Sequence, residues 1–482
     1  MGKFVQISTT LVVLVLVLAI SASTDDVHRD SPSNSIFKLR SLSTFNMKDA
    51  IGLVFIALGL AISAAGGVGG GTIIVPVLVL IMNFDIKLAT PVSNLAIVGG
   101  AVANAGFNIR KRHPAVDRPL IDSDLALSMI PLVMGGAVVG TVLSKLLPSY
   151  LLSLLFVVLL ILGSFRTVSK GITMYRAEMN TAKIMKACKI DETPISAGIA
   201  GIQQAAIYVA EYSPGSCLKH KADDGEFGKS LLKGDEKLST YQSSDSSMRS
   251  GDETLTDILE RERHFSLARQ GIIMICYIGI VAASIGGAAV ACGGLVYWFF
   301  LVIEVPWVIA FGVATAVHLF RQHCLKVAVS YIFTEGDVYW TKRTVVIFPV
   351  ACAGAGMIAG LFGVGGGIVT GPLMIEMGVL PEVASATTAL MVLYSSAAAT
   401  AKFAVFNMIA WDWALLLFAL AFVITAISQV VILGFVRKSG RQSVIILCIG
   451  ATICVGAVLM TYQAIKTTIQ HAGESFEVHV CN

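Results

Sequence analysis

Two glycine-rich stretches with the same spacing are the residues of this sequence best suited to chemistry. Residues 66–82 run GGVGGGTIIVPVLVLIM, and residues 362–378 run FGVGGGIVTGPLMIEMG. The offset between the copies is constant, since 363 − 67 and 372 − 76 both equal 296. The eleven residues 72–82 would form a helix of roughly 16 Å, against a hydrocarbon core of about 30 Å. Short, glycine-interrupted segments at matching positions of two halves are typical of a transporter binding site.

These stretches could bind an anion. A glycine turn that opens a helix leaves backbone N–H groups free at the positive end of the helix dipole. Two such helix starts facing each other would hold a negative charge without a cationic side chain, and polar groups nearby would add donors. The candidate substrate-binding residues are Gly69, Gly70, Gly71, Thr72, Ser93 and Asn94 in the first half, and Gly365, Gly366, Gly367, Ser385, Thr387 and Thr388 in the second.

A purely structural role is the alternative for these residues. Glycines in membrane helices often serve only close packing, and most Ser and Thr hydroxyls there bond to their own backbone. The duplication, the truncated helix and the prolines Pro76 and Pro372 favour binding. The sequence contains no HExxH or GxSxG motif, no pair of carboxylates in the apolar segments and no nucleotide-binding motif. We therefore expect a protein that is not an enzyme, with no catalytic residue, no metal and no cofactor.

Ionisable residues inside apolar segments are rare and therefore informative. Glu376 shares its segment with the second glycine stretch and is the candidate for a proton-coupling carboxylate, with an end residue that reaches water as the alternative. Glu304 and His318 lie in a later apolar segment, and Lys402 lies near the end of another. We interpret Lys402 as a side chain that extends to the membrane interface.

The composition identifies an integral membrane protein with an all-α, polytopic fold. The mean hydropathy is +0.79 and 14% of the 482 residues are charged, against about 25% in soluble domains. The apolar runs are long and lack the alternation of β-barrel strands. The net charge of +4 gives no reason to expect nucleic acid, and the nine cysteines form no CxxC or Cys/His cluster.

The N-terminal residues resemble a secretory signal. In 1–23, Lys3 precedes an apolar run and then small residues, which is the layout of a cleavable signal peptide, with an uncleaved signal anchor as the alternative. A polar segment at 24–47 would follow on the lumenal side. We therefore expect a multi-pass protein of the secretory pathway or the plasma membrane.

The apolar segments form two groups of five, separated by two linking segments. The first group fills 48–170, the linking pair 269–320 and the second group 343–464, and each group includes one short glycine-interrupted segment. The polar region 171–268 is predicted to be a disordered cytosolic linker, and 465–482 a lumenal tail. Because five and two crossings precede the second group, the two groups would be inverted repeats.

The placement of Lys and Arg predicts the orientation. If both short segments cross the membrane, the loops rich in Lys and Arg all face the cytosol, and the loops without them all face the lumen. The first glycine loop would then lie at the cytosolic face and the second at the lumenal face. The predicted cytosolic loops are 109–123, 171–268, 321–342 and 437–441, and the predicted lumenal loops are 84–85, 148, 292–294 and 407–411.

The chain resembles a known family in three places. GVGGGTIIVP, GLFGVGGGIVTGPLMIEMGVLPEVASATTAL (360–390) and RHPAVDRPLIDSDLAL (112–127) resemble the sulfite exporter TauE/SafE family, particularly its eukaryotic, plant-like branch. The resemblance implies a transporter of small sulfur-containing anions driven by a proton or ion gradient, with the glycine motifs, Ser385 and Thr387 at its site. The first half departs from the family pattern, since LATPVSNLA (88–96) is interrupted by Pro91.

Two functions follow as expectations. The first is a secondary transporter that exposes a midplane site alternately to each side of the bilayer, with a small inorganic or organic anion and the lipid bilayer as partners and homo-oligomerisation left open. The alternative is a membrane scaffold or adaptor that acts through the cytosolic linker without transport.

Overall fold

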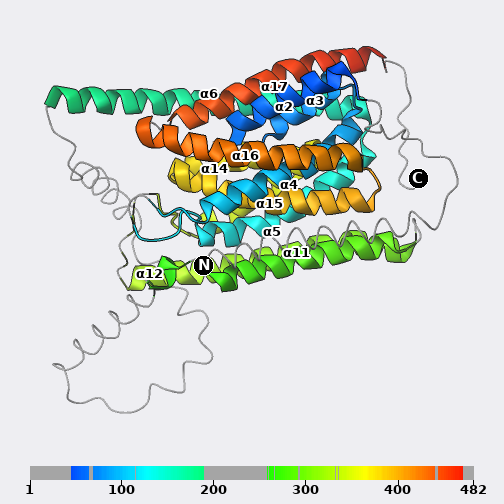
Figure 1. The fold of residues 1–482 in the computed structure, drawn as a ribbon. Coiled ribbons are helices and arrows are strands. Elements are labelled where there is room, and N and C mark those ends of the chain that lie inside the picture. Colours follow the sequence, from blue (N-terminus) through cyan, green and yellow to red (C-terminus); the bar gives the residue numbers. More distant parts are fainter. Residues whose placement is uncertain are drawn as a thin grey trace, which may run out of the picture.

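The protein is an all-α bundle, as the sequence predicts (Figure 1). A signal peptide at 1–23, nearly all of the polar segment 24–47, most of the linker and the end of the tail lie outside the described residues. The computed structural model describes residues 45–64, 69–113, 116–188, 258, 260–264, 266–290, 294–329, 331, 333–334, 336–439 and 443–470.

Every apolar segment predicted from the sequence corresponds to one helix. The first group is α2 (Met47–Ser63), α3 (Gly71–Leu80), α4 (Ile86–Asn108), α5 (Ser123–Leu146) and α6 (Ser149–Cys188). The linking pair is α11 (Leu267–Ala288) and α12 (Leu295–Ala328). The second group is α13 (Thr344–Phe362), α14 (Gly367–Glu376), α15 (Pro381–Val405), α16 (Trp411–Ser439) and α17 (Ser443–Gln470).

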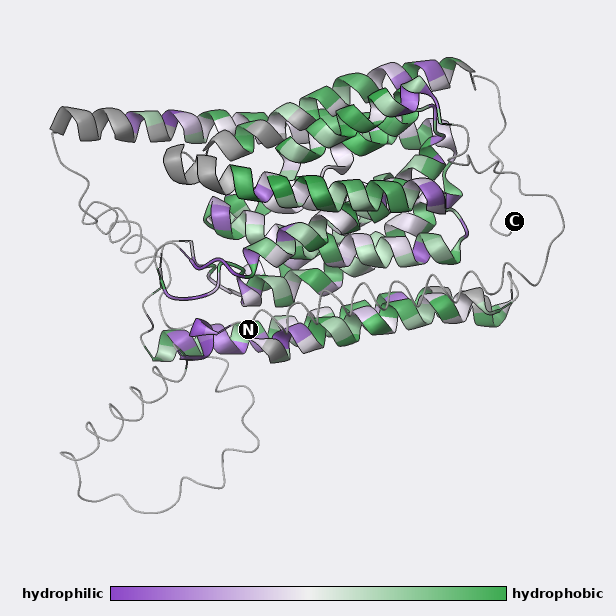
Figure 2. Cartoon of the chain, in the orientation of Figure 1, coloured by the Kyte–Doolittle hydropathy of each residue, from purple (hydrophilic) through white to green (hydrophobic). Residues whose placement is uncertain are grey.

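The surface of the bundle is that of a membrane protein. Eight of the described helices are long and apolar enough to cross a bilayer. Hydrophobic residues cover the outward sides of the helices, and hydrophilic residues gather toward their ends (Figure 2). The spans of α4 and α15 are 89% and 94% buried, whereas that of α12 is only 24% buried. Helices α4 and α15 therefore form the centre of the bundle, and α12 faces outward.

Several helices begin where side-chain caps predict that they should. Asp85 caps α4 by accepting from the Lys87 amide at 2.9 Å, and Asp122 caps α5 by accepting from the Asp124 amide at 2.8 Å. Such caps satisfy N–H groups that have no partner within the helix. The short helices α3 and α14 have glycine at this position and no side-chain cap.

The loops meet in two sets, one at each end of the bundle. At one end, which we call the Arg118 end, Arg118 pairs with Asp337, and Arg263 Nε lies 2.8 Å from Asp117 Oδ2. At the opposite end, which we call the Asp85 end, Ser149 Oγ donates to Asp85 Oδ1 at 3.1 Å. Loops that the sequence placed on the same side thus meet at the same end, and which end faces the cytosol stays a prediction.

The prediction that the short segments cross the membrane is wrong. Helix α3 folds back along α2, since Gly52 lies against Met82 and Gly59 lies against Ile73. A Cβ atom on Gly71 would lie 2.6 Å from the carbonyl oxygen of Gly363, so the two glycine turns touch inside the protein. Ten residues reach about 15 Å, half of the hydrocarbon core. In Figure 1, α3 lies toward one end of the bundle and α14 toward the other.

Helix α6 extends past its predicted end. The sequence placed the start of the linker at 171, but α6 continues to Cys188. Residues 171–188 include Met174, Ala177, Glu178 and Met179, which favour helix even in water. The predicted segment ended at 170 because the residues that follow are polar. A change from apolar to polar residues indicates where a helix leaves the bilayer, and the helix itself can continue into water.

Helices α5 and α13 are in direct backbone contact. A Cβ atom on Gly136 would lie 2.0 Å from the Ala353 carbonyl oxygen, and one on Gly356 would lie 2.0 Å from that of Val133. Gly140 and Gly360 repeat this close approach one turn later. Both helices thus carry glycines four residues apart, the spacing with which membrane helices associate closely.

This contact predicts a difference between two alanine substitutions on α13. Gly356→Ala should destabilise the protein by about 1–3 kcal/mol, because the new methyl group overpacks the interface. Gly354→Ala should be neutral or slightly stabilising, since a Cβ there meets nothing within 4 Å. Thermal unfolding of the purified protein in detergent measures both. Equal melting temperatures for the two variants would show that α5 and α13 are not in backbone contact.

Candidate functional site

Each short helix opens on a glycine with a left-handed backbone. Gly70 at the start of α3 has φ 77°, and Gly366 at the start of α14 has φ 69°. Among the described residues, the amides of Gly71, Thr72 and Ile368 have no hydrogen-bond acceptor. Free amides at the start of a helix attract negative charge, so each turn has the donors that the sequence predicted.

The two turns are held together by helix α4. Ser93 Oγ donates to the carbonyl oxygen of Gly363 at 2.8 Å, across 270 residues of sequence. A Cβ atom on Gly363 would lie 2.6 Å from the Thr90 carbonyl oxygen. The first-half helix α4 thus positions the second-half turn, and this explains why the predicted residue Ser93 lies at the centre of the protein.

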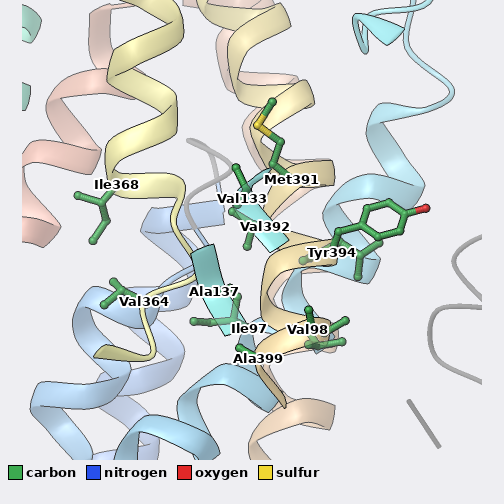
Figure 3. Packing of buried hydrophobic residues seen from close by; sticks show 14 of the residues in the cluster. Ile97, Val98, Val133, Ala137, Val364, Ile368, Met391, Val392, Tyr394 and Ala399 are labelled. Atoms are coloured by element: carbon green, nitrogen blue, oxygen red, sulfur yellow. The ribbon is translucent and has the colours of Figure 1, made fainter. Parts of the chain in front are cut away.

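Two apolar side chains cover the turns. Cβ atoms built on Gly69 and Gly365 would both contact the Ile97 and Val392 side chains, at 2.8 to 3.1 Å. Figure 3 shows Ile97 of α4 and Val392 of α15 among the buried side chains around Val364 in the second turn. The amides are therefore shielded from water, which makes them stronger partners for an anion but closes access to them.

Three buried polar atoms in this central region have no partner among the described residues. They are Thr72 Oγ1, Asn94 Oδ1 and Ser396 Oγ, on residues that are fully buried. The Ser396 hydroxyl lies 3.4 Å from the Cβ position of Gly365. An unsatisfied buried polar atom costs about 1–3 kcal/mol, so each of these atoms indicates a place where a ligand or water could bind.

A small cavity lies beside the first turn. The space open to the centre of a water molecule is about 10 Å³, which is about enough for one water. A sulfur oxyanion does not fit there without movement of the surrounding side chains. The cavity is lined by Leu60, Ser63, Ala64, Gly69, Gly100, Ala101, Asn104, Val392 and Thr425.

A chain of polar side chains leads from this cavity to the Arg118 end. Gln429 Nε2 donates to the Ala64 carbonyl oxygen at 2.8 Å and to Asn104 Oδ1 at 2.9 Å. Asn108 donates to the same Asn104 oxygen at 2.8 Å. Lys111 Nζ then donates to Asn108 Oδ1 at 2.6 Å. We call these four side chains the polar ladder.

The predicted site residues include no member of the polar ladder. Asn108 follows Asn104 by one helical turn, and this spacing could have indicated a shared face. Gln429 is a lone amide in an apolar segment of α16, more than 300 residues away, and nothing in the sequence relates it to α4.

The predicted second-half polar residues do not gather at the glycine turns. The Thr387 hydroxyl accepts from the Asp122 amide at 3.2 Å, near the Arg118 end. Thr388 Oγ1 lies 3.8 Å from Met374 Sδ, and Ser385 is half-buried. Thr387 precedes Ser396 by nine residues, or about 13 Å along α15. Within α15, Ser396 therefore lies closer to the turns than the residues chosen from the sequence.

Charged residues cover the Arg118 end of α15. Arg269 Nη1 lies 2.7 Å from Asp124 Oδ1, and Lys326 Nζ lies 2.5 Å from Glu262 Oε1. A cavity lies among these residues and reaches Val383 at the start of α15. The centre of a water molecule can lie anywhere within about 60 Å³ of it. Burial, followed by the charge of Asp124, raises the pKa of Asp122 above its ordinary value. The ion pairs of Asp124 with Arg269 and Lys326 join α5 to α11 and α12 at this end.

Two ionisable residues singled out in the sequence have contrasting environments. Glu376 is exposed at the end of α14, opposite the turn that begins this helix. Its role in proton coupling stays a prediction. Lys402 was interpreted as extending to the interface, and this is wrong. It is buried and pairs with Glu304 at 2.7 Å, because a carboxylate on α12 satisfies its charge inside the protein.

Comparison with known proteins finds a matching family model and several relatives. Residues 51–212 match the family described as Sulfite exporter TauE/SafE. Sulfite exporter TauE/SafE family protein 3 of Arabidopsis thaliana is 28% identical over 414 residues, which cover 86% of this chain and 78% of the relative. Family protein 2 is 25% identical over 84% of this chain and 80% of its own length. Family protein 5 is 23% identical over 93% of both chains.

No solved structure matches the chain. The relatives are named as exporters and not as enzymes, in agreement with the expectation that this chain is not an enzyme. The apolar helices make it a multi-pass integral membrane protein. Together with the glycine motifs that suggested the resemblance, these matches show that the chain is similar to proteins of the sulfite exporter TauE/SafE family.

Proposed function

We propose that this protein is a secondary transporter that moves a small sulfur-containing anion across a membrane. The observation that carries the proposal is the meeting of two short helix starts, with free amides, inside the bundle. The names of the Arabidopsis relatives, sulfite exporter TauE/SafE family proteins, support sulfite and related sulfur oxyanions or sulfonates as the class of substrate.

The proposed site lies between the glycine turns. The amides of Gly71, Thr72 and Ile368 would donate to the anion, together with the hydroxyls of Thr72 and Ser396. Neutral donors bind an anion strongly enough to replace its water but weakly enough to release it, which transport requires. The other predicted glycines would give the turns their backbone shape; they are Gly69, Gly70, Gly365, Gly366 and Gly367. Ser93 would fix the second turn against α4 through its hydrogen bond to Gly363.

Alternating access would come from two inverted repeats. Helices α2 and α3 form a hairpin from the Asp85 end, and α13 and α14 form one from the Arg118 end, which supports an inverted relationship. Movement of α4 against α15 would separate Ile97 from Val392 and open the turns to one side. The polar ladder would then lead the anion toward the Arg118 end.

Transport in proteoliposomes tests this proposal. The purified protein should take up sulfite, or another anion of a panel containing thiosulfate, sulfate, a sulfonate and acetate, with saturation and with counterflow. Empty liposomes are the control. Correctly inserted protein that carries none of these anions would contradict transport and favour the scaffold alternative.

The glycine turns predict a second result. Gly366→Ala should reduce uptake by at least about tenfold, because a side chain at φ 69° costs about 1–2 kcal/mol and deforms the helix start. Gly371→Ala on the same helix is the matched control, since its Cβ would meet nothing within 4 Å. Equal uptake by both variants would show that the turn does not form part of the site.

The role predicted for Glu376 has its own test. Glu376→Gln should make uptake independent of pH if this carboxylate carries the coupling proton. The exposed position of Glu376 predicts that the variant folds normally, so uptake at several pH values measures the role directly. A wild-type pH profile would remove Glu376 from the mechanism.

A further inference from the structure

A buried ion pair joins three helices outside the glycine turns. Lys402 Nζ on α15 lies 2.7 Å from Glu304 Oε1 on α12. Ser284 Oγ on α11 donates to the same carboxylate oxygen at 2.7 Å and accepts from Lys402 at 3.4 Å. The side chains of Lys402 and Glu304 are only 4% and 3% exposed. Both lie within helices long enough to cross the membrane.

Stability alone does not explain this pair. Removing two charges from water costs several kcal/mol per ion, and apolar residues of similar size often stabilise a protein equally well or better. Ionisable residues inside membrane segments therefore indicate functional sites by default. Here the pair links the outward-facing helix α12 to α15, the most buried of the spans.

The pair lies at the Asp85 end, close to a second lysine. The Lys402 ammonium is 5.8 Å from the centre of the Phe406 ring, and the Lys145 ammonium is 4.7 Å from the same centre. Lys145 is half-buried and makes no salt bridge among the described residues. An anion arriving at this end would thus meet Lys145 first and find Lys402 beyond a single aromatic ring.

The charged groups around the pair are few. Helix α5 carries Lys145 at this end and Asp124 at the other, and α13 carries no acidic, basic or histidine side chain after its first residue. Helix α4, which packs against α15, adds Lys87 at the Asp85 end, and its ammonium donates to the Lys145 carbonyl oxygen at 3.5 Å. The other charged or histidine side chains on α11, α12 and α15 lie at the Arg118 end or in that half of α12; they are Arg269, Glu382, His318, Arg321, His323 and Lys326.

We propose that Glu304 and Lys402 form a proton-coupled anion-binding site, which rests on the proposed transport function. A proton from the Asp85 side adds to the Glu304 carboxylate, and the neutral acid releases the Lys402 ammonium. The transported anion then replaces the carboxylate as the partner of Lys402. No other bond forms or breaks. One proton and one monovalent anion enter together, so the buried site remains neutral at every stage.

Neutrality is the physical reason for this coupling. An anion that bound Lys402 while Glu304 kept its charge would place a net negative charge in the protein interior, which is costly. Protonation without an anion would leave the Lys402 charge unbalanced. Each ligand therefore favours the binding of the other, and this linkage is reciprocal.

Four variants in proteoliposomes test the proposal, with uptake and internal pH recorded together. The wild type should carry protons with the anion, and uptake should rise as the external pH falls. Glu304→Gln should bind the anion but lose proton movement and pH dependence. Lys402→Met should lower uptake at least about tenfold, and the double variant E304Q/K402M should do the same without proton movement. Glu376→Gln tests the competing coupling residue under the same conditions. Uptake of a sulfonate, whose charge does not change over this pH range, corrects for the protonation of sulfite itself.

Folding is controlled by thermal unfolding of each variant. Lys402→Met leaves a buried charge alone and should be the least stable variant, whereas E304Q/K402M contains no buried charge and should unfold near the wild-type temperature. Wild-type uptake and proton coupling in the double variant would overturn the proposal and leave the pair a structural contact. Loss of proton movement in Glu376→Gln but not in Glu304→Gln would overturn it too. A wild type that carries no anion would instead overturn the proposed function.

Discussion

Unwound backbone inside a membrane must be covered by protein, and the rest of this structure depends on that constraint. Free amides in lipid cost several kcal/mol each, so neither glycine turn can face the bilayer. Each turn covers the other, with Gly71 against the Gly363 carbonyl. The two most buried spans, α4 and α15, enclose the contact, and the remaining helices keep those two away from lipid. The bundle is therefore built outward from the meeting of two broken helices.

The apolar surroundings also determine how the helices are held together. Lipid is as apolar as leucine, so burial of hydrophobic surface does little to bring membrane helices together. Close backbone contact takes its place, as at Gly136 and Gly356 between α5 and α13. Because α13 leads into the second turn, this contact also fixes where Gly363 lies. The Ser93 hydrogen bond then joins the turn to α4, and both halves share one rigid centre.

The sequence predicted the helices and the short segments but misplaced the turns. Counting charged loops cannot distinguish a segment that crosses from a hairpin that returns, since both leave every loop on the same side. The length of ten residues decides it, because α3 and α14 reach only halfway. The partners of Gln429 and Glu304 could not have been found from the sequence. Their contacts with Asn104 and Lys402 join residues 325 and 98 positions apart, and no local pattern encodes such a pairing.

Lysine side chains lie at both ends of the bundle, and neutral hydrogen-bond donors lie between them. Lys111 ends the polar ladder at the Arg118 end, and Lys145 and Lys402 lie at the Asp85 end. Between them the turns offer only amides and hydroxyls, since a full positive charge at the centre would bind an anion too tightly to release it. In the proposed transporter, cations at both ends would attract the anion, and neutral donors in the middle would let it pass. Lys402 is the one buried lysine or arginine among the described residues, and Glu304 balances its charge inside the protein.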